Sequence, residues 1–429
     1  MQIYEIFCGC AVNYLFLPLI AHVRCFTIRI KMIPSPFASP LYLMAKPVGP
    51  ACNLACHYCY YLEKSRLFAD PKHTYMSDEM LDLFVRSYLD SQTMPEVMFT
   101  WHGGEAMMRD IGFYRRVIEL QQRYGRGRPI MNCIQTNGTL LTDEWCRFLR
   151  DNGWLVGISI DGPEEFHNEY RRNRAGKASF AQTMRGIAML QRYGVEWNAM
   201  AVINDYNADF PDEFYNFFRD IGCRYLQFTP VVERRNASGA LRAGSDKDGE
   251  VTDFSVTPAQ WGNFLCRVFD LWRRTDVGSI FVQIFDATLA NWVGQPPGIC
   301  AMAPTCGHAG AVEHNGDVYS CDHFVFPEYR LGNLRTHTVA EMMYSPRQNA
   351  FGAAKRDSLP AQCRQCRWLF ACNGECPRNR FATTADGEPG LNYLCEGYRK
   401  FFAHAAPYMD FMAAELAARR PPSNVMTLP

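Results

Sequence analysis

The sequence predicts an α/β fold, namely an open, partial (β/α)6 barrel related to the TIM barrel, followed by a cysteine-rich C-terminal domain. Short apolar runs alternate with amphipathic stretches after residue 95, and this alternation stops near residue 295, where Pro, Gly and Cys become dense. Strand–helix alternation implies parallel strands joined by right-handed crossovers. About six such units are too few for a closed eight-stranded barrel, so we expect an open one.

Each unit of the predicted barrel pairs an apolar run with an amphipathic one. The expected strands are Val97–Trp101, Ile130–Thr136, Leu155–Asp161, Glu196–Ile203, Arg224–Pro230 and Ile280–Asp286. The expected helices are Ser77–Ser91, Ile111–Tyr124, Thr142–Asn152, Ser179–Tyr193, Asp209–Ile221 and Pro258–Arg274. Ser77 and Thr142 are typical first residues of a helix, because a side-chain oxygen there accepts hydrogen bonds from free N–H groups of the first turn.

The chain divides into four predicted regions. Residues 1–43 form an extension that the fold does not need, residues 44–294 the barrel, residues 295–400 the cysteine-rich domain, and residues 401–429 a helix with a disordered tail. The polar, Gly-rich stretch Arg234–Thr252 is expected to be a long surface loop. Residues 295–400 show little apolar periodicity, so something other than a hydrophobic core must hold their shape.

Composition and charge exclude several classes of partner. Lys+Arg and Asp+Glu are both 44, so no net field favours nucleic acid or an anionic membrane. The apolar run at residues 10–23 is too short to span a bilayer, and it lacks the basic start and the clear cleavage site of a signal peptide. The 18 Cys are bunched, which in a chain of this length favours metal binding over disulfides. We therefore expect a cytoplasmic metalloprotein.

The first cysteine cluster has the spacing C-x3-C-x2-C, formed by Cys52, Cys56 and Cys59. Three thiolates can bind three corners of a cubane iron–sulfur cluster, which leaves the fourth iron open. An open coordination position is what a catalytic metal needs. The alternative is a zinc knuckle completed by His57 or His73, although structural zinc sites usually carry paired cysteine units.

A second group of cysteines lies in the C-terminal region. Eight thiolates are the number needed to close two four-iron clusters, and the eight are Cys300, Cys306, Cys321, Cys363, Cys366, Cys372, Cys376 and Cys395. Spacing alone leaves zinc open for one set of four. Disulfides would require an oxidising compartment and would not explain the first three cysteines.

The first motif resembles that of the radical S-adenosylmethionine superfamily, and the pattern from Cys363 to Cys395 resembles its SPASM domain. The resemblance implies three 4Fe–4S clusters, with S-adenosyl-L-methionine chelating the open iron and yielding a 5′-deoxyadenosyl radical. It also implies two interleaved ligand sets. The nearer auxiliary cluster would use Cys300, Cys306, Cys321 and Cys376, and the farther one Cys363, Cys366, Cys372 and Cys395.

The same resemblance suggests contacts to S-adenosylmethionine. The turn Gly103-Gly104-Glu105 follows a predicted strand and would meet the methionyl amine, because glycines let backbone approach a ligand closely. Ser159 and Arg171 would contact the ribose and the carboxylate, and Tyr58 the adenine side. The alternatives are a strand-end hydrogen bond for Ser159 and a solvated side chain for Arg171.

Within this group the chain is most similar to the anaerobic sulfatase-maturating enzymes, from about residue 44 to residue 398. The similar segments include Trp101–Glu105, Gln135–Gly138, Ile158–Pro163 and Cys321–Phe324, while Ala106 departs from the usual Pro. The resemblance implies oxidation of a Cys or Ser in an unfolded sulfatase polypeptide to formylglycine, with a flavodoxin or ferredoxin-type electron donor. It makes Asp322 the general base; the alternative is a turn residue that caps local N–H groups.

Two other functions remain open from the sequence. One is a maturase of ribosomal peptides that forms a thioether or carbon–carbon crosslink, although only about 43 residues precede the first motif, fewer than an average domain. The other is a zinc- or cluster-binding scaffold without catalysis. Iron and sulfide analysis of anaerobically purified protein would separate the scaffold from the enzymes, because three four-iron clusters require about twelve irons per chain.

Overall fold

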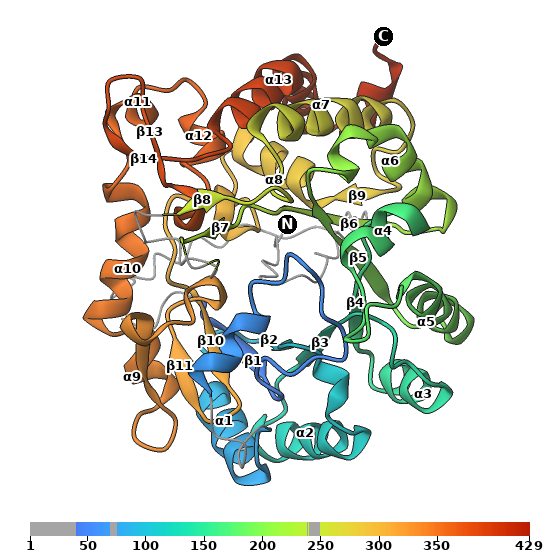
Figure 1. Ribbon diagram of the computed structural model, residues 1–429, viewed down its shortest axis with the longest axis vertical. Coiled ribbons are helices and arrows are strands. Elements are labelled where there is room, and N and C mark those ends of the chain that lie inside the picture. Colours follow the sequence, from blue (N-terminus) through green and yellow to red (C-terminus); the bar gives the residue numbers. More distant parts are fainter. Residues whose placement is uncertain (1–39, 69–74, 238, 240–248) are drawn as a thin grey trace, which may run out of the picture.

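The computed structural model describes residues 40–68, 75–237, 239 and 249–429, and its centre is one ten-stranded sheet. The strand order is β12-β11-β10-β1-β2-β3-β4-β5-β6-β9. The parallel part is formed by β1 (Tyr42–Lys46), β2 (Val97–Trp101), β3 (Ile130–Thr136), β4 (Leu155–Ser159), β5 (Trp197–Ile203) and β6 (Tyr225–Pro230). Figure 1 shows this sheet curving as an open barrel, as the sequence predicted.

The first strand was not among the expected ones. β1 lies between β10 and β2 in the sheet, and Leu41 and Leu43 beside or within it are buried. The boundary expected at residue 43 therefore falls inside β1, because Leu41 and Leu43 pack into the core. The rest of the predicted extension, residues 1–39, lies outside the described residues.

The expected strand Ile280–Asp286 is wrong for most of its length. Only β9 (Phe281–Val282) pairs with β6, and the chain then forms the helix α8 (Gln283–Trp292). Ile284, Phe285 and Ala287 are buried in that helix. A short apolar run does not distinguish a buried strand from a buried helix, so periodicity could not settle this segment.

The helices between the strands cover the outer face of the sheet (Figure 1). They are α1 (Asp78–Ser91), α2 (Ile111–Tyr124), α3 (Asp143–Asp151), α4 (Glu164–Tyr170), α5 (Phe180–Tyr193), α6 (Pro211–Asp220) and α7 (Pro258–Thr275). All except α4 were expected at nearly these bounds. Both predicted caps are confirmed, since Ser77 Oγ accepts from Met80 N at 3.1 Å and Thr142 Oγ1 accepts from Trp145 N at 3.3 Å.

The cysteine-rich region is joined to the barrel through the sheet itself. β10 (Ala309–Glu313) runs parallel to β1, and β11 (Asp317–Tyr319) and β12 (Arg330–Asn333) extend the sheet antiparallel. The remainder is short: α9 (Val339–Met343), α10 (Pro346–Asp357), α11 (Ala361–Arg364), α12 (Leu369–Cys372) and the hairpin β13 (Ala382–Thr383) with β14 (Pro389–Leu391). The sheet thus continues across the domain boundary predicted at residue 295.

The last region differs from its prediction. α13 (Cys395–Ala417) begins before residue 401 and packs along α7 (Figure 1). The tail expected to be disordered instead forms a 3-10 helix, Pro422–Thr427, with Val425 fully buried. Arg273 donates from Nη2 to the carbonyl oxygen of Pro429 at 2.9 Å. One apolar anchor and a buried guanidinium therefore fix a segment whose composition alone indicated disorder.

The expected surface loop Arg234–Thr252 is structured at both ends. β7 (Arg234–Arg235) pairs antiparallel with β8 (Glu250–Val251), and Arg234 is buried. Residues 238 and 240–248 lie outside the described part.

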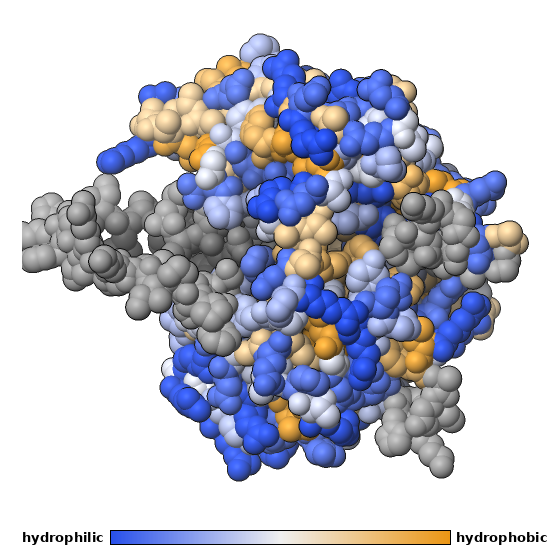
Figure 2. All heavy atoms as spheres, turned by 90° about the vertical axis from the view of Figure 1, so that its left-hand side faces the viewer, coloured by the Kyte–Doolittle hydropathy of each residue, from blue (hydrophilic) through white to orange (hydrophobic). Residues whose placement is uncertain are grey.

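Figure 2 shows one face of the molecule, on which hydrophilic residues surround small apolar groups. Within the described ranges, no helix combines the length and the hydropathy needed to cross a bilayer.

Candidate active site

The three cysteines of the first motif lie in the loop that follows β1. Ala55 N donates to Arg172 O at 2.8 Å, and His57 N donates to Tyr170 O at 3.0 Å. These bonds fix the loop against the segment after β4, at the carboxyl ends of the parallel strands. Active sites of barrel folds form at this end of the strands.

Burial controls the chemistry of these thiols. It raises the pKa of both Cys52 and Cys56 to about 12, and it also raises the pKa of Cys59. Cys52 and Cys59 each raise the pKa of neighbouring cysteines further, because negative charges repel one another. Such thiols keep their protons unless a cation is bound, and iron binding would displace those protons. The trio therefore fits the three-thiolate cluster that the sequence predicts.

The Gly103-Gly104-Glu105 turn lies directly against the cysteine loop. Gly104 N donates to Gly49 O at 2.7 Å, and Glu105 N donates to Ala51 O at 2.8 Å. A Cβ at position 104 would lie 2.0 Å from Ala51 O, and Gly103 has a φ of +140°. Both positions require glycine, because side chains would push the loop away. The predicted contact of this turn to the cofactor stays a prediction.

Glu105 is engaged with the protein rather than open to a ligand. Its carboxylate accepts from Met107 N at 3.0 Å, Thr136 Oγ1 at 2.7 Å and Asn137 N at 2.7 Å. Burial raises the pKa of Glu105, and these three donors oppose that effect. The side chain therefore ties the turn after β2 to the end of β3, which gives it a positioning role.

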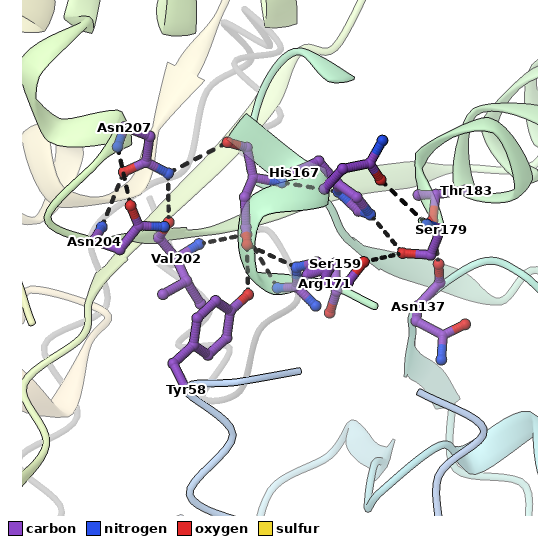
Figure 3. A network of polar contacts seen from close by, with 12 residues as sticks. Tyr58, Asn137, Ser159, His167, Arg171, Ser179, Thr183, Val202, Asn204 and Asn207 are labelled. Carbon is purple, nitrogen blue, oxygen red and sulfur yellow. Dashed lines mark hydrogen bonds and ion pairs between the residues drawn. The ribbon is translucent and has the colours of Figure 1, made fainter. Parts of the chain in front are cut away.

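Tyr58 and Arg171 converge on one buried carboxylate, that of Asp161. Arg171 donates to Asp161 from Nε at 2.8 Å and from Nη2 at 3.1 Å, and Tyr58 donates its hydroxyl hydrogen. Val202 N also donates to Asp161, at 2.9 Å. Figure 3 shows Tyr58, Arg171 and Val202 pointing toward this common centre. Arg171 is only 7% exposed, so the interpretation of a solvated side chain is wrong.

Ser159 lies at the end of β4, one strand away from Gln135 at the end of β3. Gln135 Nε2 donates to Ser159 Oγ at 3.0 Å, which is the strand-end hydrogen bond that the sequence offered as the alternative. Gln135 is 4% exposed and its Oε1 atom has no hydrogen-bond partner among the described residues. The bond explains Ser159 without a ligand, and its contact to the ribose stays a prediction.

Asp322 occupies a charged cluster on the other side of the cysteine loop. It follows Cys321, forms an ion pair with Lys46 and accepts from Tyr60 Oη at 2.6 Å. Burial acts to raise the pKa of Asp322, but the charge of Lys46 outweighs it and holds that pKa well below its usual range, and the His102 and His323 rings add to this effect only when they are protonated. The carboxylate is therefore ionised near neutral pH, as a proton acceptor must be.

Neighbouring strands supply the partners of this cluster. Lys46 lies opposite Glu313 in the parallel register of β1 and β10, and its ammonium is 3.7 Å from the centre of the Tyr61 ring. Tyr61 donates its hydroxyl hydrogen to Glu313. Arg378 stacks over the Tyr60 ring at 4.6 Å. Sequence reasoning missed these roles; only the position of Lys46 and Tyr60 beside the cysteine motif signalled them.

The first auxiliary ligand set is brought together around α10. Burial raises the pKa of all four thiols, and their mutual repulsion adds to that effect; the four are Cys300, Cys306, Cys321 and Cys376. Lys355 Nζ donates to Cys300 O at 2.6 Å and to Ala301 O at 2.8 Å, and its charge lowers the pKa of the nearby thiols. Four thiols close enough for their charges to act on one another, beside a buried cation, fit an anionic thiolate cluster.

The second auxiliary ligand set lines one cavity of about 390 Å³. Its walls include all four predicted ligands, which are Cys363, Cys366, Cys372 and Cys395. Within the described ranges no three Cys, His, Asp or Glu side chains converge closely enough to hold a single metal ion. A cubane cluster is larger than one ion and separates its ligands more widely, so the cavity and the thiols together fit the cluster.

Family comparisons agree with this geometry. The family model of the Radical SAM superfamily matches residues 47–218, and that of the SPASM iron-sulfur cluster-binding domain matches residues 306–367. The solved structure of native anSMEcpe with bound AdoMet and Cp18Cys peptide is 30% identical, covers 88% of this chain and 100% of that chain, and has a TM-score of 0.77. Streptococcus suis SuiB, at 14–15% identity and a TM-score of about 0.56, shares the fold alone.

Two sequence relatives are more specific. A serine-type anaerobic sulfatase-maturating enzyme of Bacteroides thetaiotaomicron is 62% identical over 397 residues, which cover 91% of this chain and 96% of that protein. A cysteine-type anaerobic sulfatase-maturating enzyme of Clostridium perfringens is 31% identical over 86% of this chain and 97% of that protein.

The barrel with its three-cysteine loop, continued by a cysteine-rich extension, defines a radical S-adenosylmethionine enzyme with a SPASM domain. More narrowly, the chain belongs to the family of anaerobic sulfatase-maturating enzymes.

Proposed function

We propose that this enzyme oxidises an active-site serine of an unfolded sulfatase to formylglycine, with cysteine as a second substrate. The observation that carries the proposal is the 62% identity to a serine-type enzyme over 91% of the chain. The ion pair between the buried Lys46 and the partly exposed Asp322 supports it, because the oxidation needs an ionised base that the substrate side chain can reach.

The proposed reaction removes two hydrogens from the serine side chain. Cys52, Cys56 and Cys59 would hold the cluster that binds S-adenosylmethionine, and this cofactor would supply a radical able to remove one hydrogen atom from Cβ. Asp322 takes the hydroxyl proton, and an auxiliary cluster held by the C-terminal cysteines would accept the remaining electron as the carbon–oxygen double bond forms. Lys46 and Tyr60 hold the Asp322 carboxylate in place by an ion pair and a hydrogen bond.

The two auxiliary ligand sets would hold two four-iron clusters, so we propose three clusters per chain. The nearer set includes Cys321, which directly precedes the proposed base, and this adjacency supports an auxiliary cluster as the electron acceptor. A flavodoxin or ferredoxin-type protein would exchange electrons with the enzyme. We also propose a cytoplasmic location, because eleven ligand thiols must stay reduced and cytoplasmic conditions keep them so.

The decisive experiment is anaerobic incubation of reconstituted enzyme with reductant, S-adenosylmethionine and a serine-containing sulfatase-motif peptide. Mass spectrometry should detect the loss of two hydrogen atoms, and an aldehyde-reactive hydrazide should label the product. A crosslinked peptide that lacks an aldehyde would favour the ribosomal-peptide maturase instead. Protein that holds zinc and no sulfide would favour a scaffold and contradict the proposal.

A further inference from the structure

His102 lies next to the proposed base but has no part in the mechanism above. It directly follows β2, and its N–H donates to Ala45 O at 2.8 Å. The register pairs Ala45 with Trp101, so Lys46 and His102 stand side by side at the ends of β1 and β2. Lys46 forms an ion pair with Asp322, so the end of β1 brings the proposed base close to His102, and the charges of Lys46 and Asp322 both act on the His102 ring.

The tautomer of His102 follows from its backbone contacts. Gly103 N donates to Nδ1 at 2.7 Å, and Nδ1 also lies 3.2 Å from Gly103 O. A backbone amide can only donate, so Nδ1 must be the unprotonated nitrogen, and the shorter contact decides the assignment. Burial lowers the pKa of His102 to about 4, so the ring is neutral near pH 7. A neutral imidazole whose Nδ1 accepts carries its hydrogen on Nε2.

The Nε2–H group is an uncommitted donor. No hydrogen bond from Nε2 is formed to any residue in the part of the chain that the structure describes. The residue is half-buried, and Nε2 is not among the fully buried polar atoms that lack a partner, so this edge of the ring stays accessible. A donor with a fixed direction beside an ionised carboxylate can bind an oxygen whose proton that carboxylate removes.

We propose that His102 Nε2–H donates a hydrogen bond to the reacting side-chain oxygen of the substrate and thereby favours serine over cysteine. The bond strengthens as negative charge builds on this oxygen when Asp322 takes its proton, as donors of an oxyanion hole do. Sulfur is a weak hydrogen-bond acceptor, so a cysteine substrate gains little from the same donor. The inference rests on the proposed function and adds a residue that determines its substrate preference.

Two substitutions at His102 test the contributions of the two ring nitrogens separately. His102→Asn keeps an acceptor for Gly103 N near the Nδ1 position but removes the Nε2 donor. His102→Gln places an amide donor near the Nε2 position. We measure kcat and KM for matched serine and cysteine peptides, together with 5′-deoxyadenosine release and iron content, and His337→Asn on the surface serves as the matched control.

We expect His102→Asn to lower kcat for the serine peptide by roughly 10²-fold, the cost of losing one such donor, with a much smaller loss for the cysteine peptide. His102→Gln should restore most of the serine activity, and 5′-deoxyadenosine release should persist in both variants. If the His102→Asn variant loses iron, the measurement is repeated with histidine methylated at Nε2 at position 102. That side chain keeps the Nδ1 acceptor and removes only the Nε2 donor.

The outcomes separate the inference from the proposed function. A wild-type enzyme that forms no aldehyde would overturn the proposed function and this inference with it. Wild-type oxidation combined with an unchanged serine-to-cysteine ratio in the donor-less variants would overturn the inference alone, as would equal activities of His102→Asn and His102→Gln. A selective loss for serine that glutamine restores would support it, because a merely structural role would affect both peptides equally.

Discussion

At the scale of single residues, neighbours rather than identity decide what each polar side chain does. Asp161 and Asp322 are both carboxylates near the cysteine loop. Asp161 is completely buried and accepts hydrogen bonds from Arg171, Tyr58 and a backbone amide. Its carboxylate oxygens are therefore occupied and cannot contact a substrate. Asp322 has two partners and is 15% exposed, so it can still accept a proton. This difference supports the proposal of Asp322, rather than Asp161, as the base.

Replacing Asp322 by asparagine tests its role as the base. Asp322→Asn keeps the size of the side chain but removes its charge, so aldehyde formation should fall by ~10²-fold or more. Release of 5′-deoxyadenosine and the iron content should persist, and both are measured in the same incubation. The exposed Asp386→Asn should match the wild type. Normal maturation by Asp322→Asn would rule out the assignment.

Gly104 tests the contact between the turn and the cysteine loop. A Cβ added at this position would lie 2.0 Å from Ala51 O and 2.7 Å from Pro50 C, both backbone atoms that cannot move cheaply. Gly104→Ala should therefore displace the loop that carries Cys52. We expect iron to fall from about twelve to about eight per chain, with S-adenosylmethionine cleavage lost and the auxiliary signals kept in electron paramagnetic resonance spectra. Full iron content would contradict this account.

At the scale of elements, α10 supports the nearer auxiliary ligand set. Lys355 is 1% exposed and reaches from this helix to the carbonyl oxygens of Cys300 and Ala301. The helix thus binds the start of the ligand segment and supplies a positive charge where thiolates gather. A buried ammonium is tolerated only when it is paired in this way.

Lys355→Met removes that charge while it keeps the length of the side chain. Two carbonyl groups lose their donor and the thiolates lose a compensating cation, so the nearer auxiliary cluster should be lost or become labile. We expect about four fewer irons per chain and intact S-adenosylmethionine binding, measured by iron analysis and calorimetry. The exposed Lys177→Met is the control. Unchanged iron content would show that this lysine is dispensable.

At the scale of the whole molecule, one sheet unites the barrel with part of the cysteine-rich region, while the rest of that region depends on its ligands. Strands β10 to β12 pair with β1, whereas the segment that carries Cys363 to Cys395 forms only short helices and a hairpin. Cluster binding therefore contributes folding free energy mainly to residues 360–395.

Removal of the clusters tests this division. Chelation under air should lower the hydrogen-exchange protection of backbone amides in residues 360–395. The amides of β2 to β6 should keep their protection, because those strands are held by backbone hydrogen bonds and a buried core. Hydrogen exchange with mass spectrometry, on the holo and the chelated full-length protein, measures both regions at once. Equal loss of protection in the barrel would show that the clusters stabilise the whole chain rather than this segment.

Much of the fold could be predicted because periodicity and caps are local. β2, β3 and α2 have the predicted bounds, and the cysteine spacing indicated metal binding, which the family resemblance narrowed to iron–sulfur clusters. Ile280–Asp286 and β1 could not be predicted in the same way, because a short apolar run is compatible with either element until its neighbours are known. The tail after Pro421 depends on Arg273, which lies far from it in the sequence.

The sequence by itself identified the eleven candidate cluster ligands, because cysteine number and spacing are local features, and the resemblance to a known family favoured iron–sulfur clusters over zinc. Only the tertiary structure decided which polar groups are free to act. Lys46, His102 and Asp322 lie in separate segments. Lys46 and His102 come together because the parallel strands β1 and β2 end at the same edge of the sheet, and Asp322 reaches Lys46 from the turn after the antiparallel strand β11. Charge pairing and burial, which depend on those neighbours, then set whether a side chain positions, donates or accepts a proton.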